Sequence, residues 1–229
     1  MKPLLLDILA CPICKYYPLK LDIYKWETSE GKFTKIKEAF REKKLESLKN
    51  ATKIRRGKDR IDDGIIITPN KEVLMKDEMV RKKVNIKAYF EEVVTKFENF
   101  TVMKDHTDEV YSSCLTLIKE EIIKSVNDTK AEVSTKDLNN LPLETQKKII
   151  NDILPEIYLL NWFFQFTEIE EGIIFCEKCN RWYPIIETIP QMLPDDLREE
   201  SETDFLKKWE SNLSNEIKEK GKPFNLKTK

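Results

Sequence analysis

Apolar residues follow one spacing in the middle of this chain and another near its two ends. Between residues 107 and 127 they recur mostly three or four positions apart, as on one face of an α-helix. Polar residues 107–109 favour a helix start, and residues 127–128 are expected to end the helix. The pattern therefore predicts a helix whose buried stripe is Val110, Cys114, Leu117, Ile118 and Ile122.

Three further stretches in the middle have helical character: residues 30–58, residues 72–100, and a long stretch that starts at 141–144 and continues to about 164. The last starts within residues 141–144, where Pro142 is tolerated at a helix start, and Pro155 is expected to kink it. The run 65–67 between them is either a short buried strand or an extended linker. The expected apolar faces are Phe33, Ile36, Phe40, Leu45 and Leu48 in the first stretch, and Ile149, Ile150, Ile153, Ile157, Leu160 and Phe164 in the last.

The two ends of the chain have short strand-like apolar runs instead. Residues 1–24 and 166–197 also contain four of the five cysteines and six of the ten prolines. The final stretch, 198–229, is predicted to be a charged helix followed by a tail. Its apolar side docks either on the body or on a partner, and consists of Phe205, Leu206, Trp209, Leu213 and Ile217.

Charge and hydropathy argue against several classes of partner. The 40 basic residues almost cancel the 41 acidic ones, so no overall positive field attracts a nucleic acid. The apolar start at residues 4–6 imitates a lipoprotein signal, but Asp7 interrupts it. Because no run approaches the ~20 apolar residues of a membrane span, we expect a soluble cytoplasmic protein without a membrane partner.

Cysteines form two Cys-x-x-Cys pairs, Cys11 with Cys14 and Cys176 with Cys179. Each pair can place two thiolates on one metal ion, and two pairs complete the tetrahedral sulfur shell that Zn²⁺ prefers. Asn180 tolerates the left-handed backbone that often follows a second cysteine, whereas Lys15 lacks that advantage. We therefore predict one structural zinc ion per chain and no hydrolysis at the metal, because no coordination position remains for water.

The separation of the two pairs by residues 15–175 is unusually long. Closing such a loop costs roughly 4–5 kcal/mol, whereas a structural zinc contributes about 10–16 kcal/mol. Redox-active pairs and disulfides remain alternatives. The fold class predicted is α+β: a small zinc-ribbon-like β domain formed by residues 1–24 plus 166–197, interrupted by a mainly helical insertion domain, 25–165.

A specific motif surrounds the second cysteine pair. Residues 171–193 read EGIIFCEKCNRWYPIIETIPQML, and the first pair belongs to Leu-x-x-Leu-x-Cys-Pro-x-Cys. These segments resemble the tRNA-methyltransferase activator family, of the archaeal and eukaryotic type with a helical insertion. Where the family often has Asp-Gly, this chain has Glu187 and Thr188, which do not favour the turn's positive φ.

The resemblance implies a non-catalytic, zinc-binding subunit that keeps SAM-dependent methyltransferases soluble and active. Such subunits form heterodimers with one or several methyltransferases that modify tRNA, ribosomal RNA or a translation release factor, and reach RNA only through the partner. They pair a strand with the partner's sheet and mask an apolar patch. The run 185–189 suits such an edge strand. The candidate partner-binding residues, which alternatively form the domain's own core, are Leu4, Leu5, Ile8, Leu9, Ile185, Ile186, Ile189, Pro190, Met192 and Leu193.

Other chemistry-bearing residues favour ordinary roles. The basic run 53–60 is either a solvated helix end or an RNA contact, and His106 lacks a partner for base catalysis. Cys114 and the aromatic run 162–164 are expected in the core. No Gly-rich phosphate loop, nucleophile motif or SAM-binding signature is present, which argues against a methyltransferase. A zinc-ribbon nucleic-acid-binding factor of transcription or translation and an enzyme with its site in the insertion remain the alternatives.

Overall fold

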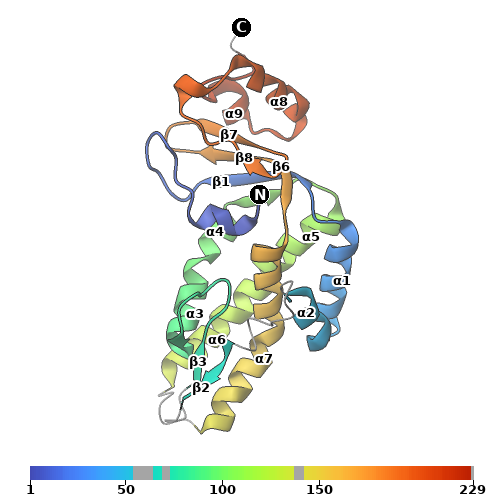
Figure 1. The fold of residues 1–229 in the computed structure, drawn as a ribbon, viewed down its shortest axis with the longest axis vertical. Coiled ribbons are helices and arrows are strands. Elements are labelled where there is room, and N and C mark those ends of the chain that lie inside the picture. Colours follow the sequence, from blue (N-terminus) through green and yellow to red (C-terminus); the bar gives the residue numbers. More distant parts are fainter. Residues whose placement is uncertain (54–63, 69–72, 137–141, 228–229) are drawn as a thin grey trace.

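A computed structural model describes residues 1–53, 64–68, 73–136 and 142–227. The chain forms a β-sheet with a helical body on one face and short C-terminal helices on the other (Figure 1). The longest strands come from both ends of the chain and most helices from the middle, so the predicted α+β class is confirmed.

The sheet has the order β5-β1-β6-β7-β8. Strand β1 (Lys20–Trp26) pairs antiparallel with β6 (Ile169–Cys176), which joins β7 (Arg181–Ile186) through the second cysteine pair. Strand β5 (Met103–Asp105) adds to β1 in parallel, and β8 (Ile189–Pro190) folds back on β7. The β1–β6 pairing therefore places the two ends of the intervening chain side by side.

Several predicted helices differ in extent from the observed ones. The first is broken into α1 (Glu30–Arg41) and α2 (Leu45–Ala51), because Lys43 has a φ of 51° between them and Phe40 and Leu45 do not keep the helical period. The helix that was predicted to start at residues 107–109 begins at Glu109, as expected. Residues 127–128 do not end that helix, because exposed Asn and Asp side chains are tolerated within a helix whose apolar side remains packed.

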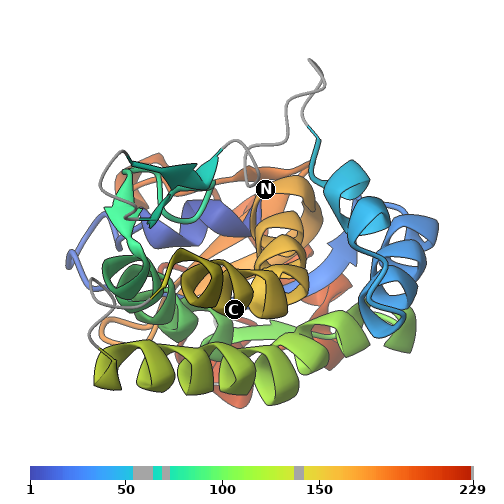
Figure 2. The same cartoon turned by 90° about the horizontal axis from the view of Figure 1, so that it is seen from below.

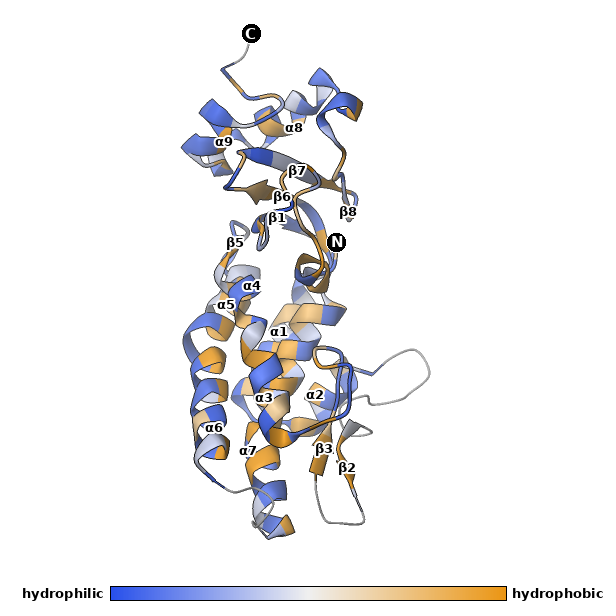
Figure 3. Ribbon diagram, turned by 90° about the vertical axis from the view of Figure 1, so that its left-hand side faces the viewer, coloured by the Kyte–Doolittle hydropathy of each residue, from blue (hydrophilic) through white to orange (hydrophobic). Residues whose placement is uncertain are grey.

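Seven helices of the described chain form the body. Helix α5 (Glu109–Leu117) continues through a π-helical turn (Ile118–Ile122) into α6 (Ile123–Thr135), and α7 (Leu143–Asn161) ends in another (Trp162–Phe166). Helix α7 lies between α1–α2 and α6, as Figure 2 shows, and apolar residues alternate with polar ones along α6 and α7 in Figure 3. Cys114 and the aromatic residues Trp162–Phe164 are buried, as predicted.

The helix expected over 72–100 is correct only in its second half. Described residues form a small sheet, β2 (Ile66–Ile67), β3 (Val73–Met75) and β4 (Val84–Asn85), before α3 (Ile86–Thr95) and α4 (Phe97–Thr101). Buried Asp77 causes the difference, since its carboxylate accepts hydrogen bonds from the backbone N–H groups of Met79 and Val80. Within the run at 65–67, Ile66 and Ile67 form a strand, but Ile67 is exposed rather than buried.

The C-terminal stretch is not the single helix that its apolar stripe predicted. It folds into a 3₁₀ turn (Glu200–Glu202), α8 (Thr203–Lys208), a second 3₁₀ turn (Glu210–Asn212) and α9 (Asn215–Lys220). The chain is broken into short pieces because Phe205, Leu206, Leu213 and Ile217, in and between these pieces, pack against the sheet residues Tyr24, Ile173, Phe175 and Trp182. The stripe therefore docks on the body of the chain.

Some predictions concern residues that the structure does not describe. The basic run 53–60 falls outside the described residues except for Lys53, and so does the end of the first predicted helix. In the described parts of the chain, no helix is both long and apolar enough to cross a membrane.

Candidate metal centre and partner surface

Four thiols from the two ends of the chain meet at one point. Cys11 and Cys14 follow the N-terminal 3₁₀ helix (Pro3–Asp7), whereas Cys176 is the last residue of β6 and Cys179 lies in the turn before β7. The Sγ atoms of Cys11 and Cys179 are 3.6 Å apart, those of Cys14 and Cys176 are 3.4 Å apart, and all four lie within 4.8 Å of one another. A tetrahedral zinc with bonds of about 2.3 Å requires sulfur–sulfur separations of about 3.8 Å, so the cluster fits a metal ion of that size.

The two cysteine pairs have the same backbone turn. Lys15 donates its N–H to the Cys11 carbonyl and Asn180 donates to that of Cys176, and both donors have a φ of 58°. The left-handed geometry at Asn180 agrees with its residue type. Lysine has no such preference for positive φ. Lys15 adopts this conformation because both turns need the same geometry for the two pairs of thiols to converge.

Electrostatics around the thiols support thiolate formation at one ligand. Burial opposes ionisation of Cys11, but backbone N–H groups of Cys14 and Ile13 and the Tyr183 hydroxyl, 3.3 Å from its Sγ, lower the pKa of Cys11 to about 6. Burial raises the pKa of Cys176 and Cys179. A cluster of four buried or half-buried thiols without nearby carboxylate ligands suits a thiophilic divalent ion, which ionises thiols by binding them.

Strand pairing brings the distant cysteines together before any metal is considered. Ile169 donates its N–H to the Met1 carbonyl over 2.7 Å, and the N-terminal ammonium donates to the Ile169 carbonyl. β1 and β6 then pair over six residue positions up to the second cysteine pair. The sheet therefore carries most of the loop-closure cost, and a metal has to fix only the two turns.

The sequence matches a known family over most of its length. The model of the Trm112p-like proteins matches residues 2–187, which include all four clustered cysteines. The chain belongs to the Trm112p-like family. This membership is consistent with the tRNA-methyltransferase activator subunits that the motifs indicated. No match was found among curated proteins or among solved structures.

The candidate partner-binding residues differ in exposure. Ile8 is 75% exposed and Ile189 59%, and Ile186 and Leu193 are also exposed. Ile185 is fully buried, packed within the core, so its side chain has no surface to offer a partner. The remaining candidates, Leu4, Leu5, Leu9, Pro190 and Met192, are half-buried.

The turn between β7 and β8 keeps its positive-φ geometry without glycine. Glu187 has a φ of 48° and Thr188 a φ of 68°, and Ile186 pairs with Ile189 across the turn. Two residues with positive φ match the twist of adjacent strands. Thr188 also donates its N–H to the Glu170 carbonyl over 3.1 Å, which helps to hold a conformation that β-branched residues rarely adopt.

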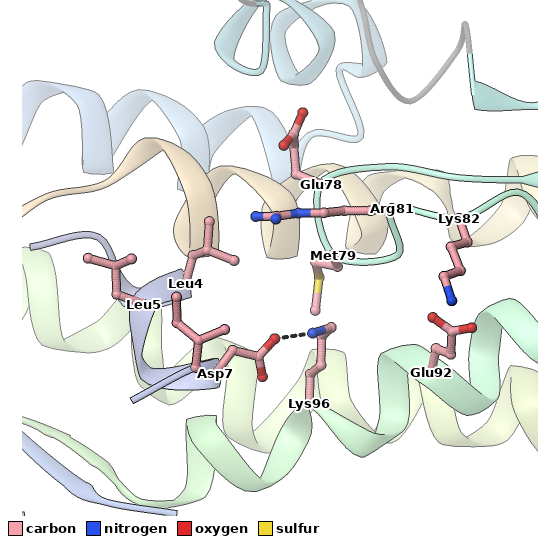
Figure 4. A pocket seen from close by; sticks show the side chains of 10 residues that line it. Leu4, Leu5, Asp7, Glu78, Met79, Arg81, Lys82, Glu92 and Lys96 are labelled. Atoms are coloured by element: carbon pink, nitrogen blue, oxygen red, sulfur yellow. Dashed lines mark hydrogen bonds and ion pairs between the residues drawn. The ribbon is translucent and has the colours of Figure 1, made fainter. Parts of the chain in front are cut away.

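A groove of about 340 Å³ joins the N-terminal turn to the insertion (Figure 4). Leu4, Leu5 and Ile8 line it on one side. Residues from the loop after β3 and from α3 line the other, namely Glu78, Met79, Arg81, Lys82 and Glu92. Asp7 fixes the junction, because it pairs with Lys96 and accepts a hydrogen bond from the Asn99 side chain over 2.7 Å.

Several residues of the site were not identified from the sequence. Tyr183 contacts Cys11, and Met79 lies in the groove beside the N-terminal turn. Tyr183 lies within the motif at residues 171–193, and its position four residues after Cys179 could have indicated a contact with the cysteine cluster. Nothing local marked Met79, since its neighbourhood depends on the distant N-terminal turn.

Proposed function

We propose that this chain is a non-catalytic activator subunit of SAM-dependent methyltransferases, acting in the cytoplasm on enzymes that modify tRNA, ribosomal RNA or a translation release factor. The observation that carries the proposal is the Trm112p-like match together with the four converging cysteines. Chemistry takes place in the partner, and this chain supplies stability and surface.

In this proposal the metal is one structural zinc held by Cys11, Cys14, Cys176 and Cys179. Four thiolates fill its shell, so it fixes the two turns and supplies no reactive water. The turns in turn position the N-terminal 3₁₀ helix and the β7–β8 hairpin, which carry the exposed Ile8 and Ile189.

Masking of apolar surface is the proposed source of affinity. Burying a fully exposed apolar side chain is worth roughly 1.5–3 kcal/mol, and Ile8, Ile186, Ile189 and Leu193, which are 39–75% exposed, each gain a part of that. The half-buried Met192 adds a side chain that adapts to differently shaped partners. The groove beside Ile8 extends this surface onto the insertion, which gives the inserted helices a part in selecting partners.

Co-expression with candidate SAM-dependent methyltransferases tests the proposal. We expect at least one of them to gain soluble yield and methyl transfer from labelled SAM only when this chain is present. Ile8→Asp places a charge on the proposed surface and should abolish the gain. Ile67→Asp is the matched control, because Ile67 is also exposed, 45%, but lies in the insertion on β2.

If no methyltransferase gains solubility or activity, the proposed function is wrong. If Ile8→Asp and Ile67→Asp have equal effects, the apolar surface is not where the partner binds.

A further inference from the structure

On the side opposite β6, the first part of β7 has no neighbouring strand among the described residues, and other residues of the chain cover its backbone there. On this side, the Trp182 N–H donates to the Lys222 carbonyl over 3.3 Å, and the Lys222 N–H donates to the Asn180 carbonyl over 2.8 Å. The Trp182 carbonyl accepts from the Arg198 guanidinium over 2.6 Å. Pro184 has no N–H, and its carbonyl accepts from Gln191 over 2.8 Å. The edge from Asn180 to Pro184 therefore has its outward backbone groups satisfied within the chain.

Strand β8 is a poor alternative edge for an added strand. It consists of Ile189 and Pro190, and Ile189 is already paired with Ile186. Pro190 has no N–H to donate, and its carbonyl accepts from Met192 over 3.1 Å. A partner strand that pairs with this side of the sheet must therefore bond to the Asn180 carbonyl and the Trp182 N–H, the two groups that are now hydrogen-bonded to Lys222.

The segment 222–227, which we name the tail, sits on this edge in a parallel bridge between Lys222 and Arg181. Besides the Lys222 bonds, Phe224 accepts a hydrogen bond from the Trp182 indole over 2.8 Å. Phe224 and Leu226 are half-buried, whereas Leu206, Leu213 and Ile217 of the preceding helical pieces are buried. Leu226 also donates its N–H to the Lys218 carbonyl over 3.2 Å, and Lys227 pairs with Glu219 at the surface. The side chains of the tail are thus less buried than those of the helices before it.

We infer that the tail is a displaceable placeholder for a strand of the methyltransferase partner, which would take the Lys222 position and run parallel to β7. This inference rests on the proposed function. The family match ends at residue 187, so the tail lies outside the part that this chain shares with the family model. An added strand is recognised mainly through its backbone, and the tail uses the edge in the same way.

At the β7 edge itself, displacement exchanges the two Lys222 hydrogen bonds one for one, whereas the bonds from the Trp182 indole to Phe224 and from the Leu226 N–H to Lys218 are lost. A partner strand supplies a carbonyl for the Trp182 N–H and an N–H for the Asn180 carbonyl, as Lys222 does now. The apolar cover of Tyr24, Ile173 and Phe175 by α8 and α9 stays in place, because the tail begins after α9 ends. Until a partner binds, the tail prevents the edge from pairing with other chains.

Gly221 provides a way to loosen the tail without removing a core side chain. A Cβ at this position would lie 2.5 Å from the Ile217 carbonyl oxygen and 3.0 Å from the Trp182 ring. Gly221→Ala therefore forces the backbone before the tail away from Trp182. Gly31→Ala is the matched control, since a Cβ at Gly31 meets nothing within 4 Å.

Hydrogen exchange of the zinc-loaded full chain is the first measurement. We expect the Trp182 and Lys222 amides to exchange faster in Gly221→Ala than in the wild type, with the β1 and β6 amides unchanged and Gly31→Ala like the wild type. If the tail exchanges only together with β1 and β6 in every variant, it is an integral part of the fold and the inference is wrong.

The second measurement uses the methyltransferase that co-expression identifies. In the complex, residues 222–227 should lose protection while the Trp182 amide stays protected, and Gly221→Ala should bind about threefold to tenfold more tightly because more of it is competent to bind. A complex in which the tail stays protected, or in which Gly221→Ala binds no better, overturns the inference and leaves the proposed function intact. Absence of any complex refutes both.

Discussion

At the scale of single residues, the cysteines have two distinct environments. Four converge in the cluster at the sheet end, whereas Cys114 is fully buried in α5, where burial raises the pKa of its thiol to about 12. A thiol of that kind remains protonated and behaves as a small apolar side chain. The surroundings of each cysteine therefore decide whether its thiol can ionise and bind a metal or stays protonated.

Replacing one clustered cysteine should release the metal. In Cys176→Ser we expect zinc content to fall from one per chain to near zero, and the chain to lose several kcal/mol of stability, a part of the about 10–16 kcal/mol that a structural zinc contributes. Cys114→Ala should keep its zinc and lose about 1 kcal/mol or a little more. Metal analysis of purified protein and urea unfolding measure both, and equal zinc loss in the two variants would contradict the assignment.

Asp77 gives the stability a defined dependence on pH. Burial is the largest influence and raises the pKa of Asp77 above its usual 3.8, despite hydrogen bonds from Tyr89, Val80, Asn161 and Met79. The folded state therefore binds a proton more tightly than the unfolded state at this site. Its contribution is greatest below pH 3.8 and decreases as pH rises through the folded-state pKa.

Asp77→Asn removes this titration. We expect the stability difference, wild type minus variant, to decrease as pH rises from about 4, measured by urea unfolding at a series of pH values. At neutral pH the variant should still lose about 1–3 kcal/mol, because its amide N–H₂ faces the Asn161 side-chain N–H₂ that now donates to Asp77 over 2.8 Å. A stability difference that rises with pH would show that Asp77 is not the group concerned.

At the scale of elements, the β7–β8 hairpin keeps a turn that its residues do not favour. The hairpin must return Ile189 opposite Ile186, and a two-residue connection does so with positive φ at both Glu187 and Thr188. Threonine in a left-handed conformation costs roughly 1–2 kcal/mol. The pairing of β7 with β6 and the Thr188–Glu170 hydrogen bond offset this cost.

Thr188→Gly should therefore stabilise the fold by about 1 kcal/mol, since glycine adopts this φ without a steric cost. The same substitution at Thr101, exposed at the end of α4, should instead destabilise by about 0.5–1 kcal/mol, because glycine lowers helix stability. Urea unfolding of both variants measures the difference. A loss of stability in Thr188→Gly would mean that the threonine side chain contributes more than the strain costs.

At the scale of the whole molecule, patterns that are local in sequence were predictable and long-range constraints were not. The cysteine pairs, the α7 stripe and the strands at both ends were evident because each rests on residues close in sequence. Asp77 redirected a predicted helix through contacts with Asn161, and Arg198 stacks on Trp182 at 4.3 Å, so both depend on distant partners. The C-terminal stripe predicted burial correctly but not the sheet that breaks it into short helices.

The same distinction applies to the site. Spacing and motif identified all four converging cysteines, and ten candidate partner residues came from the family resemblance. The structure separates Ile185, which is buried, from Ile186 and Ile189, which are exposed, because strand residues alternate between faces and the turn then reverses the chain. The role of the tail on β7 depends on pairing between residues 182 and 222, which no local pattern predicts.

Affinity purification of the tagged full-length chain from its native host, read by mass spectrometry, tests the central claim most directly. We predict that at least one SAM-dependent methyltransferase is enriched in stoichiometric amount with the wild type and with Ile67→Asp, and is lost with Ile8→Asp. Recovery of no methyltransferase, or equal recovery with all three chains, would contradict the account.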